Sequence, residues 1–462
     1  PTAHHSPLPP MNEKQKNPNP NLVRTELETL AAVQQRLNAG GTWHDVVIQH
    51  VNLLTLDAPL SAVKIAGCHF LGCDIGTKLA EAIALAEAAA GKAQTEEERK
   101  ANPHCMVIPP MPWLPFQPFR ATLYQAEELV GTFTTEDPKI ERPVYEASVD
   151  WKSYCTFADP VTTRLFTDDS VDTVLARRLH DTFISDALDD LLAVTRAQQI
   201  TAKKGGIVAI MGGHDMPRLE KMKNAPAGTA LGDEWEGMTD DAVYTRVALL
   251  ARKLTQEGYL LVSGGGPGAM EACNLGAYFA TRAVDDLRAA IRKLQDFPEF
   301  KSGKSVEWLI PAMKVRRDYP VKPGDAEKCR SVGIPTWFYG HEPPNPFASH
   351  IAKYFENSVR EEGMLAIATH GVIFAEGNAG TVQEIFQDAC QNYYATYGTA
   401  APMILYGQDY WDPPAMPVYV NDKRKKAFPL IRKLAEEKGF THRLIVTDSL
   451  REIVKTITAF KP

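Results

Sequence analysis

The chain has 462 residues, which at roughly 150 residues per domain is enough for two or three domains. Its 44% hydrophobic and 23% charged residues are typical of a globular protein with a large core. A formal charge of −7 argues against a general nucleic-acid binder, because such proteins are usually basic. The seven cysteines are scattered and odd in number, which favours a reducing compartment over a disulfide framework.

Residues 1–22 are rich in proline, asparagine and polar side chains, and this composition predicts a flexible N-terminal arm. The arm lacks the basic and apolar segments of a signal peptide. No apolar run in the chain approaches the ~20 residues needed to span a bilayer. We therefore expect a cytoplasmic protein without membrane contact.

Residues 23–200 predict a mixed α+β region whose role the sequence does not indicate. An amphipathic helix is expected over Leu22–Leu37, and strands are expected within Val46–Phe70. The alanine-rich stretch Leu79–Ala90 is helical by propensity.

Two local features of this region have competing interpretations. Cys68 and Cys73 flank His69, but no further ligand follows at metal-binding spacing, so we expect two ordinary buried thiols. The stretch Pro103–Pro118 contains the run PPMPWLPFQP, which cannot be regular structure, because proline fixes φ and removes a hydrogen-bond donor. We interpret it as a packed connector with buried apolar side chains, and peptide recognition is the alternative.

A long helix is predicted from Val171 to Val194, and the polar run AQQITAKKGG after it marks the expected domain boundary at residue 200. His180 lies beside the apolar stripe of this helix, and we expect it to be solvated or to cap the helix rather than to act in catalysis. The stripe consists of Leu175, Leu179, Phe183, Leu188 and Leu192.

Residues 201–462 alternate short apolar runs with helical patterns, which predicts an α/β domain with a doubly wound, mostly parallel sheet. Helices are expected over Asp241–Glu257 and Ala269–Val284, and another over the segment KYFENSVREEGMLAIATHG. The predicted strands are Ile207–Met211, Leu260–Val262, Trp308–Ile310, Thr336–Tyr339, Val372–Phe374, Met403–Tyr406 and Leu444–Val446.

Three glycine-rich loops follow strands of this sheet, at the edge where open parallel sheets bind ligands. Glycine lets the backbone approach an anion, and the amides of a following helix start can bind phosphate. One such turn could be purely structural, but three on one sheet predict a nucleotide phosphate site. None is a P-loop or a dinucleotide fingerprint. The candidate residues are Gly212, Gly213 and His214, then Gly264, Gly265, Gly266, Gly268 and Met270, and finally Gly377, Asn378, Gly380 and Thr381.

The third loop also contains Glu384, three residues after Thr381. If Thr381 lies in the first helical turn, its hydroxyl can meet a phosphate while Glu384 points from the next turn into the same pocket. The alternative, which the spacing alone favours, is a capping box with Thr381 as N-cap and Glu384 at the third helical position. Arg360 is expected on a solvated helix face unless that helix lies over the pocket mouth.

The segments SGGGPGAMEA and EGNAGTVQE resemble the paired GGGxxGxM and PGGxGTxxE motifs of the "Lonely Guy" phosphoribohydrolases. The IVAIMGGH start and the segment Glu342–Pro346 resemble more closely the bacterial pyrimidine/purine nucleotide 5′-monophosphate nucleosidases, and the resemblance covers residues 205–450. It implies a modified Rossmann fold that hydrolyses the N-glycosidic bond of nucleoside 5′-monophosphates to base and ribose 5-phosphate. It also implies a homo-oligomer.

Carried over to this chain, the resemblance makes Glu384 the motif glutamate and Arg360 the helix arginine. Gly377, Gly380 and Thr381 match the phosphate loop, and Asn345 of the shared Glu342–Pro346 segment is added to the binding residues. An ionised Glu384 would stabilise the positive ribose and orient water. Arg360 would hold the phosphate or the ribose, or assist the leaving base. This scheme requires no metal or organic cofactor.

Glu376 and Asn378 stand where the family motif has proline and glycine. Asparagine tolerates left-handed backbone, so the turn can survive at Asn378. Glu376 would repel a phosphate if it pointed inward, and could alter substrate choice if it pointed outward or paired with a base edge or a cation. These departures motivate a second hypothesis, a non-catalytic nucleotide sensor of the same fold. A third, single-stranded DNA handling, is disfavoured by the net acidity.

Overall fold

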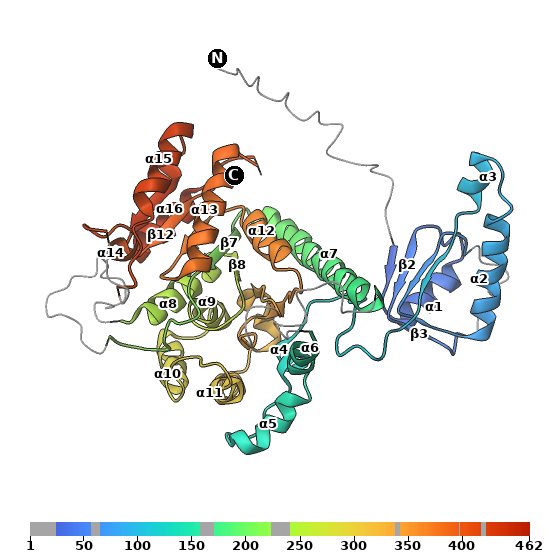
Figure 1. Cartoon of the computed structure of the whole chain (residues 1–462), viewed down its shortest axis with the longest axis horizontal. Helices are drawn as coiled ribbons and strands as arrows, with labels where there is room; N and C mark the ends of the chain where they lie inside the picture. The colour runs from blue at the N-terminus through green and yellow to red at the C-terminus, as the bar shows by residue number, and fades with distance from the viewer. Residues whose placement is uncertain are drawn as a thin grey trace, which may run out of the picture. The chain divides into compact units, whose positions relative to one another are not determined.

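The computed structural model describes residues 25–56, 65–157, 171–222, 241–337, 342–396, 398–416 and 422–462 (Figure 1). The arm expected over residues 1–22 lies outside these residues. The described chain forms two compact units. One contains the residues up to Trp113 and Gln117–Ala121, and the other contains Leu114–Phe116 and the residues from Thr122 onward.

The first unit is built on a parallel four-stranded sheet with the order β1-β2-β4-β6. Its strands are β1 (Thr25–Leu27), β2 (Val46–Gln49), β4 (His69–Leu71) and β6 (Met106–Ile108), beside a parallel pair, β3 (Asn52–Leu53) and β5 (Asp74–Ile75). Its helices are α1 (Leu30–Ala39), α2 (Thr77–Ala90) and α3 (Glu96–Ala101). Strands β1 to β5 and the inner faces of α1 and α2 share one apolar core.

One prediction for this unit needs correction and another is confirmed. The helix expected from Leu22 begins only at Leu30, because Thr29 caps α1 and the residues before it pair with β2 as strand β1. Cys68 and Cys73 are buried free thiols, as predicted, and burial raises the pKa of Cys73.

Strand β6 lies within Pro103–Pro118 but before the run PPMPWLPFQP. The run itself forms neither helix nor strand, as predicted. Phe116 is buried, but Trp113 is 62% exposed, so only part of this connector packs as expected.

The second unit contains a seven-stranded sheet whose neighbouring strands are all parallel, in the order β10-β9-β8-β7-β11-β12-β13. Strands β8 to β10 therefore lie on one side of β7, and β11 to β13 lie on the other. The register aligns Ile373 of β11 with Ile210 and Ile404. The strands are β7 (Gly206–Met211), β8 (Tyr259–Ser263), β9 (Ser331–Gly333), β10 (His350–Ile351), β11 (Val372–Phe374), β12 (Met403–Tyr406) and β13 (Leu444–Thr447).

Helices follow most of these strands, and unbroken apolar runs form the strands because side chains on both faces are buried. Four helices precede the sheet: α4 (Ala126–Val130), α5 (Pro138–Glu146), α6 (Val149–Phe157) and α7 (Val171–Ala202). The others are α8 (Val243–Gln256), α9 (Ala269–Tyr278), α10 (Val284–Leu294), α11 (Ser305–Asp318), α12 (Asn357–Ile367), α13 (Ala379–Tyr394), α14 (Gln408–Trp411), α15 (Phe428–Lys438) and α16 (Leu450–Ala459), with 3₁₀ turns at η4 (Pro323–Cys329) and η5 (Thr441–Arg443).

The strands predicted at β7, β8, β11, β12 and β13 are confirmed to within one residue at each end. The strand predicted at Trp308–Ile310 is wrong, because this run lies inside α11, and a short apolar run does not distinguish strand from buried helix. Thr336 makes only an isolated bridge with Tyr354, and Tyr339 lies outside the described residues. The helix expected over Ala269–Val284 is two helices, α9 and the start of α10.

Helix α7 extends beyond its predicted end and belongs to the second unit, so the division falls near residue 120 and not at residue 200. The predicted apolar stripe is only partly buried. Its members Phe183, Leu188 and Leu192 are buried, whereas Leu175 is 52% exposed. The expectation of a solvated or capping His180 is wrong, because its ring is fully buried among aromatic side chains.

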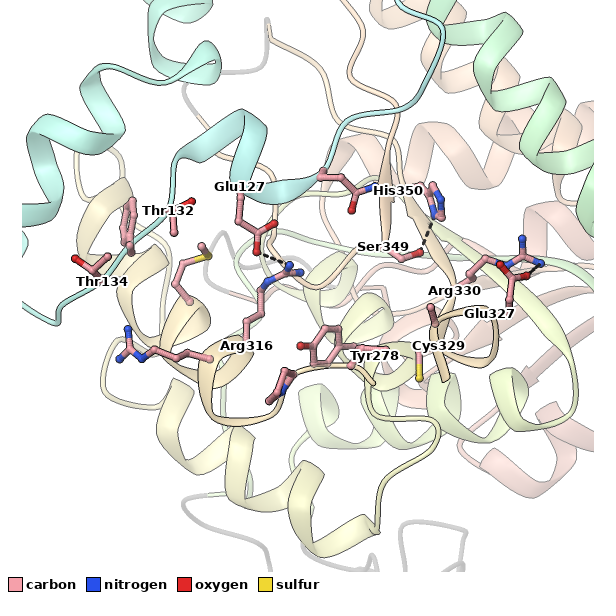
Figure 2. A pocket seen from close by; sticks show the side chains of 17 residues that line it. Glu127, Thr132, Thr134, Tyr278, Arg316, Glu327, Cys329, Arg330, Ser349 and His350 are labelled. Carbon is pink, nitrogen blue, oxygen red and sulfur yellow. Dashed lines mark hydrogen bonds and ion pairs between the residues drawn. The ribbon is translucent and has the colours of Figure 1, made fainter. Parts of the chain in front are cut away.

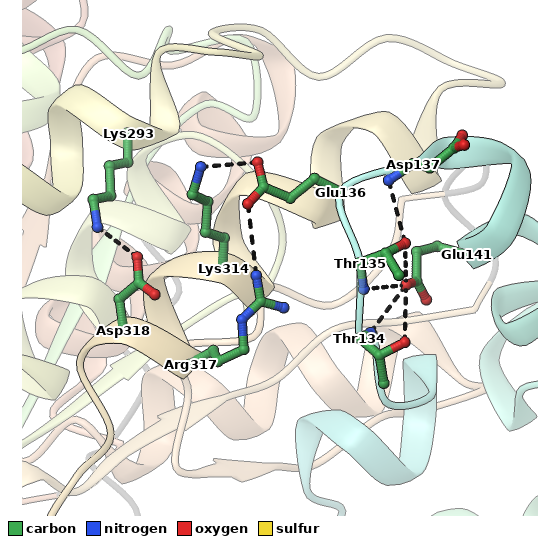
Figure 3. A network of polar contacts seen from close by, with 9 residues as sticks. All are labelled: Thr134, Thr135, Glu136, Asp137, Glu141, Lys293, Lys314, Arg317 and Asp318. Atoms are coloured by element: carbon green, nitrogen blue, oxygen red, sulfur yellow. Dashed lines mark hydrogen bonds and ion pairs between the residues drawn. The ribbon is translucent and has the colours of Figure 1, made fainter.

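Polar contacts attach the segment before α5 to α11 (Figure 3). The buried carboxylate of Glu141 accepts hydrogen bonds from the backbone and hydroxyl groups of Thr134 and Thr135. Glu136, which follows Thr135 in the chain, pairs with Lys314 of α11 at 2.8 Å and with Arg317 of α11 at 3.7 Å. Across the described ranges, no helix is both long and apolar enough to cross a membrane.

Candidate functional site

A cavity of about 530 Å³ lies where β7, β8 and β11 end, and all three glycine-rich loops line it. The strand order reverses between β7 and β11, which is the position where open α/β sheets bind ligands. The predicted residues that line the cavity are Gly212, Gly213, His214, Gly264, Gly266, Met270, Arg360, Asn378, Gly380, Thr381 and Glu384. Gly265, Gly268, Gly377 and Asn345 do not line it.

Some of the glycines are required because the loops pack against one another. The Gly213 amide donates to the Glu376 carbonyl at 2.8 Å, which joins the first loop to the third. A Cβ added at Gly377 would lie 2.9 Å from the Gly213 nitrogen and closer still to the Thr381 hydroxyl. A Cβ at Gly268 would collide with the carbonyl of Gly213. Gly268 and Gly377 therefore hold the loops together and do not face a ligand.

Gly380 differs from these positions. It lines the cavity in the exposed first turn of α13, and apart from its chain neighbours and its own helix backbone no described atom lies within 4 Å of the position a Cβ would take. The fold therefore does not need glycine here for packing. The missing side chain leaves open space beside the amides at the start of the helix.

The start of α13 excludes the capping-box alternative. The helix begins at Ala379 with Asn378 as N-cap, so Thr381 is the third helical residue and Glu384 lies one turn further on. The Asn378 side chain makes no capping hydrogen bond within the described residues. The first amides of a helix have no partner inside it, so the amides of Ala379, Gly380 and Thr381 are available at the cavity edge.

Asn378 instead supports the loop from outside. Its Nδ2 donates to Asp215 Oδ2 at 3.2 Å, and the same carboxylate pairs with Lys423 at 2.9 Å. The backbone φ of Asn378 is −98°, so the turn does not use the left-handed conformation that we considered for it. Asparagine is thus held here by a side-chain contact.

Glu376 does not line the cavity. It lines a separate space of about 330 Å³ on the other side of Gly377, together with Asp215, Tyr410 and Lys423. Burial raises the pKa of Glu376, the charge of Asp215 raises it further, and Lys423 opposes both. Of the two orientations considered for Glu376, the structure therefore shows the one that points away from the cavity, so its carboxylate does not repel a ligand there.

Arg360 is the single Lys or Arg side chain among the described residues that line the cavity. It is 8% exposed and is held in place by three acceptors. Nε donates to Asn357 Oδ1 at 2.9 Å, Nη2 to Glu361 Oε1 at 3.3 Å, and Nη1 to the Ile334 carbonyl at 3.4 Å. Helix α12 thus does lie over the cavity, and the solvated-face expectation for Arg360 is wrong.

Glu384 is a carboxyl group that titrates near neutrality. Burial raises its pKa to about 7, the charge of Arg360 lowers it in part, and that of Glu361 raises it. Such a shift, in a cavity and beside a fixed cation, is typical of functional carboxyl groups. Glu384 can therefore be converted between its neutral and ionised forms at physiological pH.

The sequence did not point to several other lining residues, which are Pro335, Thr336, Glu342, Glu361, Ala379 and Gln383. Glu361 accepts a hydrogen bond from Gln383 at 2.7 Å. Glu342 Oε1 lies 3.3 Å from His214 Nδ1. Glu342 is the first residue of the Glu342–Pro346 segment, and that segment is the sequence signal that could have identified it. Asn345 of that segment is buried and donates to Gly266 and Asn274, so it supports the second loop from behind.

A larger cavity of the second unit, about 880 Å³, contains none of these loops (Figure 2). Its three arginines have acidic partners: Arg316 pairs with Glu127, Arg317 with Glu136 at 3.7 Å, and Arg330 with Glu327 at 3.1 Å. The smaller cavity is the better candidate, because it is lined by the glycine-rich loops and by the start of α13, which the larger cavity lacks.

No family model matches the chain, and neither does any curated protein. The chemistry of the site is therefore the basis for assigning a function. Within the part of the chain that the structure describes, no three His, Cys, Asp or Glu side chains are grouped to hold a metal ion.

Proposed function

We propose that the chain hydrolyses the N-glycosidic bond of nucleoside 5′-monophosphates, releasing the free base and ribose 5-phosphate. One observation carries the proposal. Helix α13 presents an uncapped first turn to the cavity and, one turn further on, the carboxyl group of Glu384 with a pKa of about 7. The first feature suits a phosphate and the second suits the sugar attached to it.

The phosphate is assigned to the first turn of α13. The amides of Ala379 and Gly380 are exposed there, the Thr381 hydroxyl lies beside them, and the helix dipole favours an anion. Binding energy from the phosphate would fix the sugar against the reacting groups. We therefore expect free nucleosides to be poor substrates.

The reacting carbon is assigned to the neighbourhood of Glu384. Glu384 lies three residues beyond Thr381, about 4.5 Å along the axis of α13, and therefore on the side of the phosphate site where the attached sugar can extend. Water adds to C1′ while the C1′–N bond breaks, its electron pair leaves with the base, and the proton released by water neutralises the base. An ionised Glu384 stabilises the positive charge that develops on the ribose and orients the water.

Arg360 faces the same cavity from α12. We assign it to hold the phosphate or the ribose, or to assist the leaving base. The kinetics of Arg360→Ala separate these roles. A higher KM with unchanged kcat indicates binding that is equal in the ground and transition states, whereas a lower kcat indicates help to the leaving group.

We also infer that the sheet of the second unit is a modified Rossmann fold of the "Lonely Guy" type. The strand order that reverses at β7 and the glycine-rich loops support this inference. A cytoplasmic homo-oligomer that needs neither metal nor organic cofactor completes the proposal.

The test is release of free base from a panel of purine and pyrimidine nucleoside monophosphates by the purified protein. We expect Glu384→Gln and Glu384→Ala to lose most of the activity. Glu362→Gln, which changes an exposed glutamate on α12, is the matched control and should retain it. Full activity in Glu384→Ala would exclude the mechanism. Tight binding of a monophosphate without turnover would favour the nucleotide-sensor alternative.

A further inference from the structure

The start of the helix that carries Arg360 is held by a side chain from far upstream in the chain. Asp181, on α7, is 6% exposed, and both of its carboxylate oxygens accept backbone amides at the beginning of α12. Oδ1 accepts from Phe355 at 2.9 Å, and Oδ2 accepts from Glu356 at 2.7 Å. Glu356 is the N-cap of α12, and its own side chain makes no capping bond within the described residues.

Asp181 thus anchors the N-cap residue of α12 and the residue before it, although it does not accept the N2 or N3 amide as a capping side chain would. The charge is favourable as well, because a carboxylate at a helix N-terminus lies at the positive end of the helix dipole. One turn earlier on α7, Arg178 forms an ion pair with the side chain of Glu356. Two positions on α7 therefore hold the same residue of α12.

The neighbouring His180 fixes Asp181 in turn. Its Nδ1 lies 3.2 Å from Asp181 Oδ1, and its Nε2 lies 2.9 Å from the hydroxyl of Tyr124. The ring is fully buried and packs edge-on against Phe116, Trp337 and Phe355. A histidine in this position has little freedom to move, so the carboxylate beside it is held in one orientation.

A second buried pair holds the segment just before α12. Lys353 forms an ion pair with Asp150 of α6, and Asp150 also accepts the Tyr145 hydroxyl at 2.9 Å. One residue further on, Tyr354 donates its amide to the Pro335 carbonyl at 2.9 Å, and Pro335 lines the cavity. Helices α5 to α7 thereby support the chain that forms two sides of the cavity.

The first turn of α12 transmits this support to Arg360. The Arg360 amide donates to the Glu356 carbonyl at 3.2 Å, and its Nε donates to Asn357 Oδ1 at 2.9 Å. Both acceptors lie at the helix start that Asp181 anchors. A shift of that turn would therefore move the guanidinium group relative to Glu384.

We propose that Asp181, oriented by His180, is a positioning residue for Arg360 in the candidate site. The inference assigns a role to part of the region before residue 200 for which the sequence suggested none. Its kinetic consequences rest on the proposed hydrolysis, but its structural consequence, the placement of α12, does not.

The experiment is a double-mutant cycle between Asp181 and Arg360 in the full chain. Asp181→Asn keeps the size of the side chain but replaces one acceptor with a donor, and Asp181→Ala removes both acceptors. We expect kcat/KM to fall about 10-fold and up to about 100-fold, respectively, because small displacements of positioned groups have effects of this size. In an Arg360→Ala background the same changes should cost less than about 3-fold, because the group they position is gone.

A purely structural role predicts a different result, in which Asp181→Asn reduces activity by the same factor whether or not Arg360 is present. Asp190→Asn, an exposed change on the same helix, is the control and should have no effect. Equal losses in both backgrounds would overturn the inference.

Amide hydrogen exchange separates this inference from the proposed function. Asp181→Asn should accelerate exchange over residues 355–361 and leave the core of β7 unchanged. If the wild-type chain hydrolyses no monophosphate, the proposed function fails while this measurement still tests the inference. Unchanged exchange over residues 355–361 would refute the inference even in an active enzyme.

Discussion

The substitution Gly380→Ala tests whether glycine is needed at this position for ligand binding or for packing within the protein. Gly380 lies in the first turn of α13 and lines the cavity, and no described atom beyond its chain neighbours and its own helix backbone lies within 4 Å of the added methyl group. The substitution therefore introduces no clash within the protein. It does place a methyl group beside the amides to which we assign the phosphate.

Two effects of opposite sign follow. Alanine is favoured over glycine within a helix by about 0.5–1 kcal/mol, so the free energy of unfolding should rise by an amount toward the lower end of that range in this first turn. The methyl group should at the same time keep the phosphate from the amides. We expect affinity for a nucleoside monophosphate to fall by at least about 10-fold, or about 1.4 kcal/mol.

Urea unfolding measures the first effect, and calorimetric titration with a nucleoside monophosphate and with ribose 5-phosphate measures the second. A more stable variant with undiminished affinity for both ligands would refute the placement of the phosphate at this helix start. A less stable variant would refute the packing argument itself.

Three further predictions follow from the same site. Gly377→Ala should lower the free energy of unfolding by roughly 1–3 kcal/mol, because its methyl group collides with Thr381 and Gly213, and a neutral result in urea would contradict the loop packing. If the ionised form of Glu384 is the active one, kcat/KM should rise with pH through about 7, and a fall over the same range would assign Glu384 the role of a proton donor. Asp388, one turn behind Glu384, has its pKa raised to about 8 by burial, so the folded chain keeps a proton that the unfolded chain releases. Its contribution should make wild-type stability fall between pH 5 and 7 by up to about 1.4 kcal/mol per pH unit relative to Asp388→Asn, and a difference that does not change with pH would contradict the burial argument.

The sheet of the second unit was largely predictable from the sequence because its strands are buried on both faces. Runs such as Ile207–Met211 and Met403–Tyr406 are apolar without interruption and are followed by glycine, so both their length and their ends are visible. Trp308–Ile310 shows the limit of this reasoning. A run of three apolar residues fits a buried helix equally well, and the flanking residues of α11 decide between them.

The division of the chain could not be read from composition. The polar run after α7 resembles a linker, yet the helix before it packs onto the second unit through contacts such as Asp181 with the amide of Glu356. These contacts join residues 175 positions apart, and neither partner is unusual in its local sequence. The burial of His180 is not visible in the local sequence either, because the aromatic rings that bury it come from distant segments.

The site itself was predictable where glycine marked it and less so elsewhere. The glycine motifs identified the correct edge of the sheet. They did not distinguish glycines that the loop packing requires from glycines that border the cavity, because that difference depends on the three-dimensional packing. Gly377 is needed because another loop lies against it, whereas Gly380 faces open space. Glu361 and Gln383 carry no motif signal, and they line the cavity only because α12 and α13 bring them together.

The register of one helix start decides between a structural and a chemical interpretation of the third loop. If α13 began after Thr381, that residue would cap the helix and Glu384 would bind back to its backbone, and the motif would need no ligand. Because α13 begins at Ala379, Thr381 lies within the first turn and Glu384 lies one turn further on, in the cavity. A shift of three residues thus changes the same two side chains from a self-contained cap into groups that face a ligand. The Thr–Glu spacing is identical in both cases, so the sequence alone could not distinguish them.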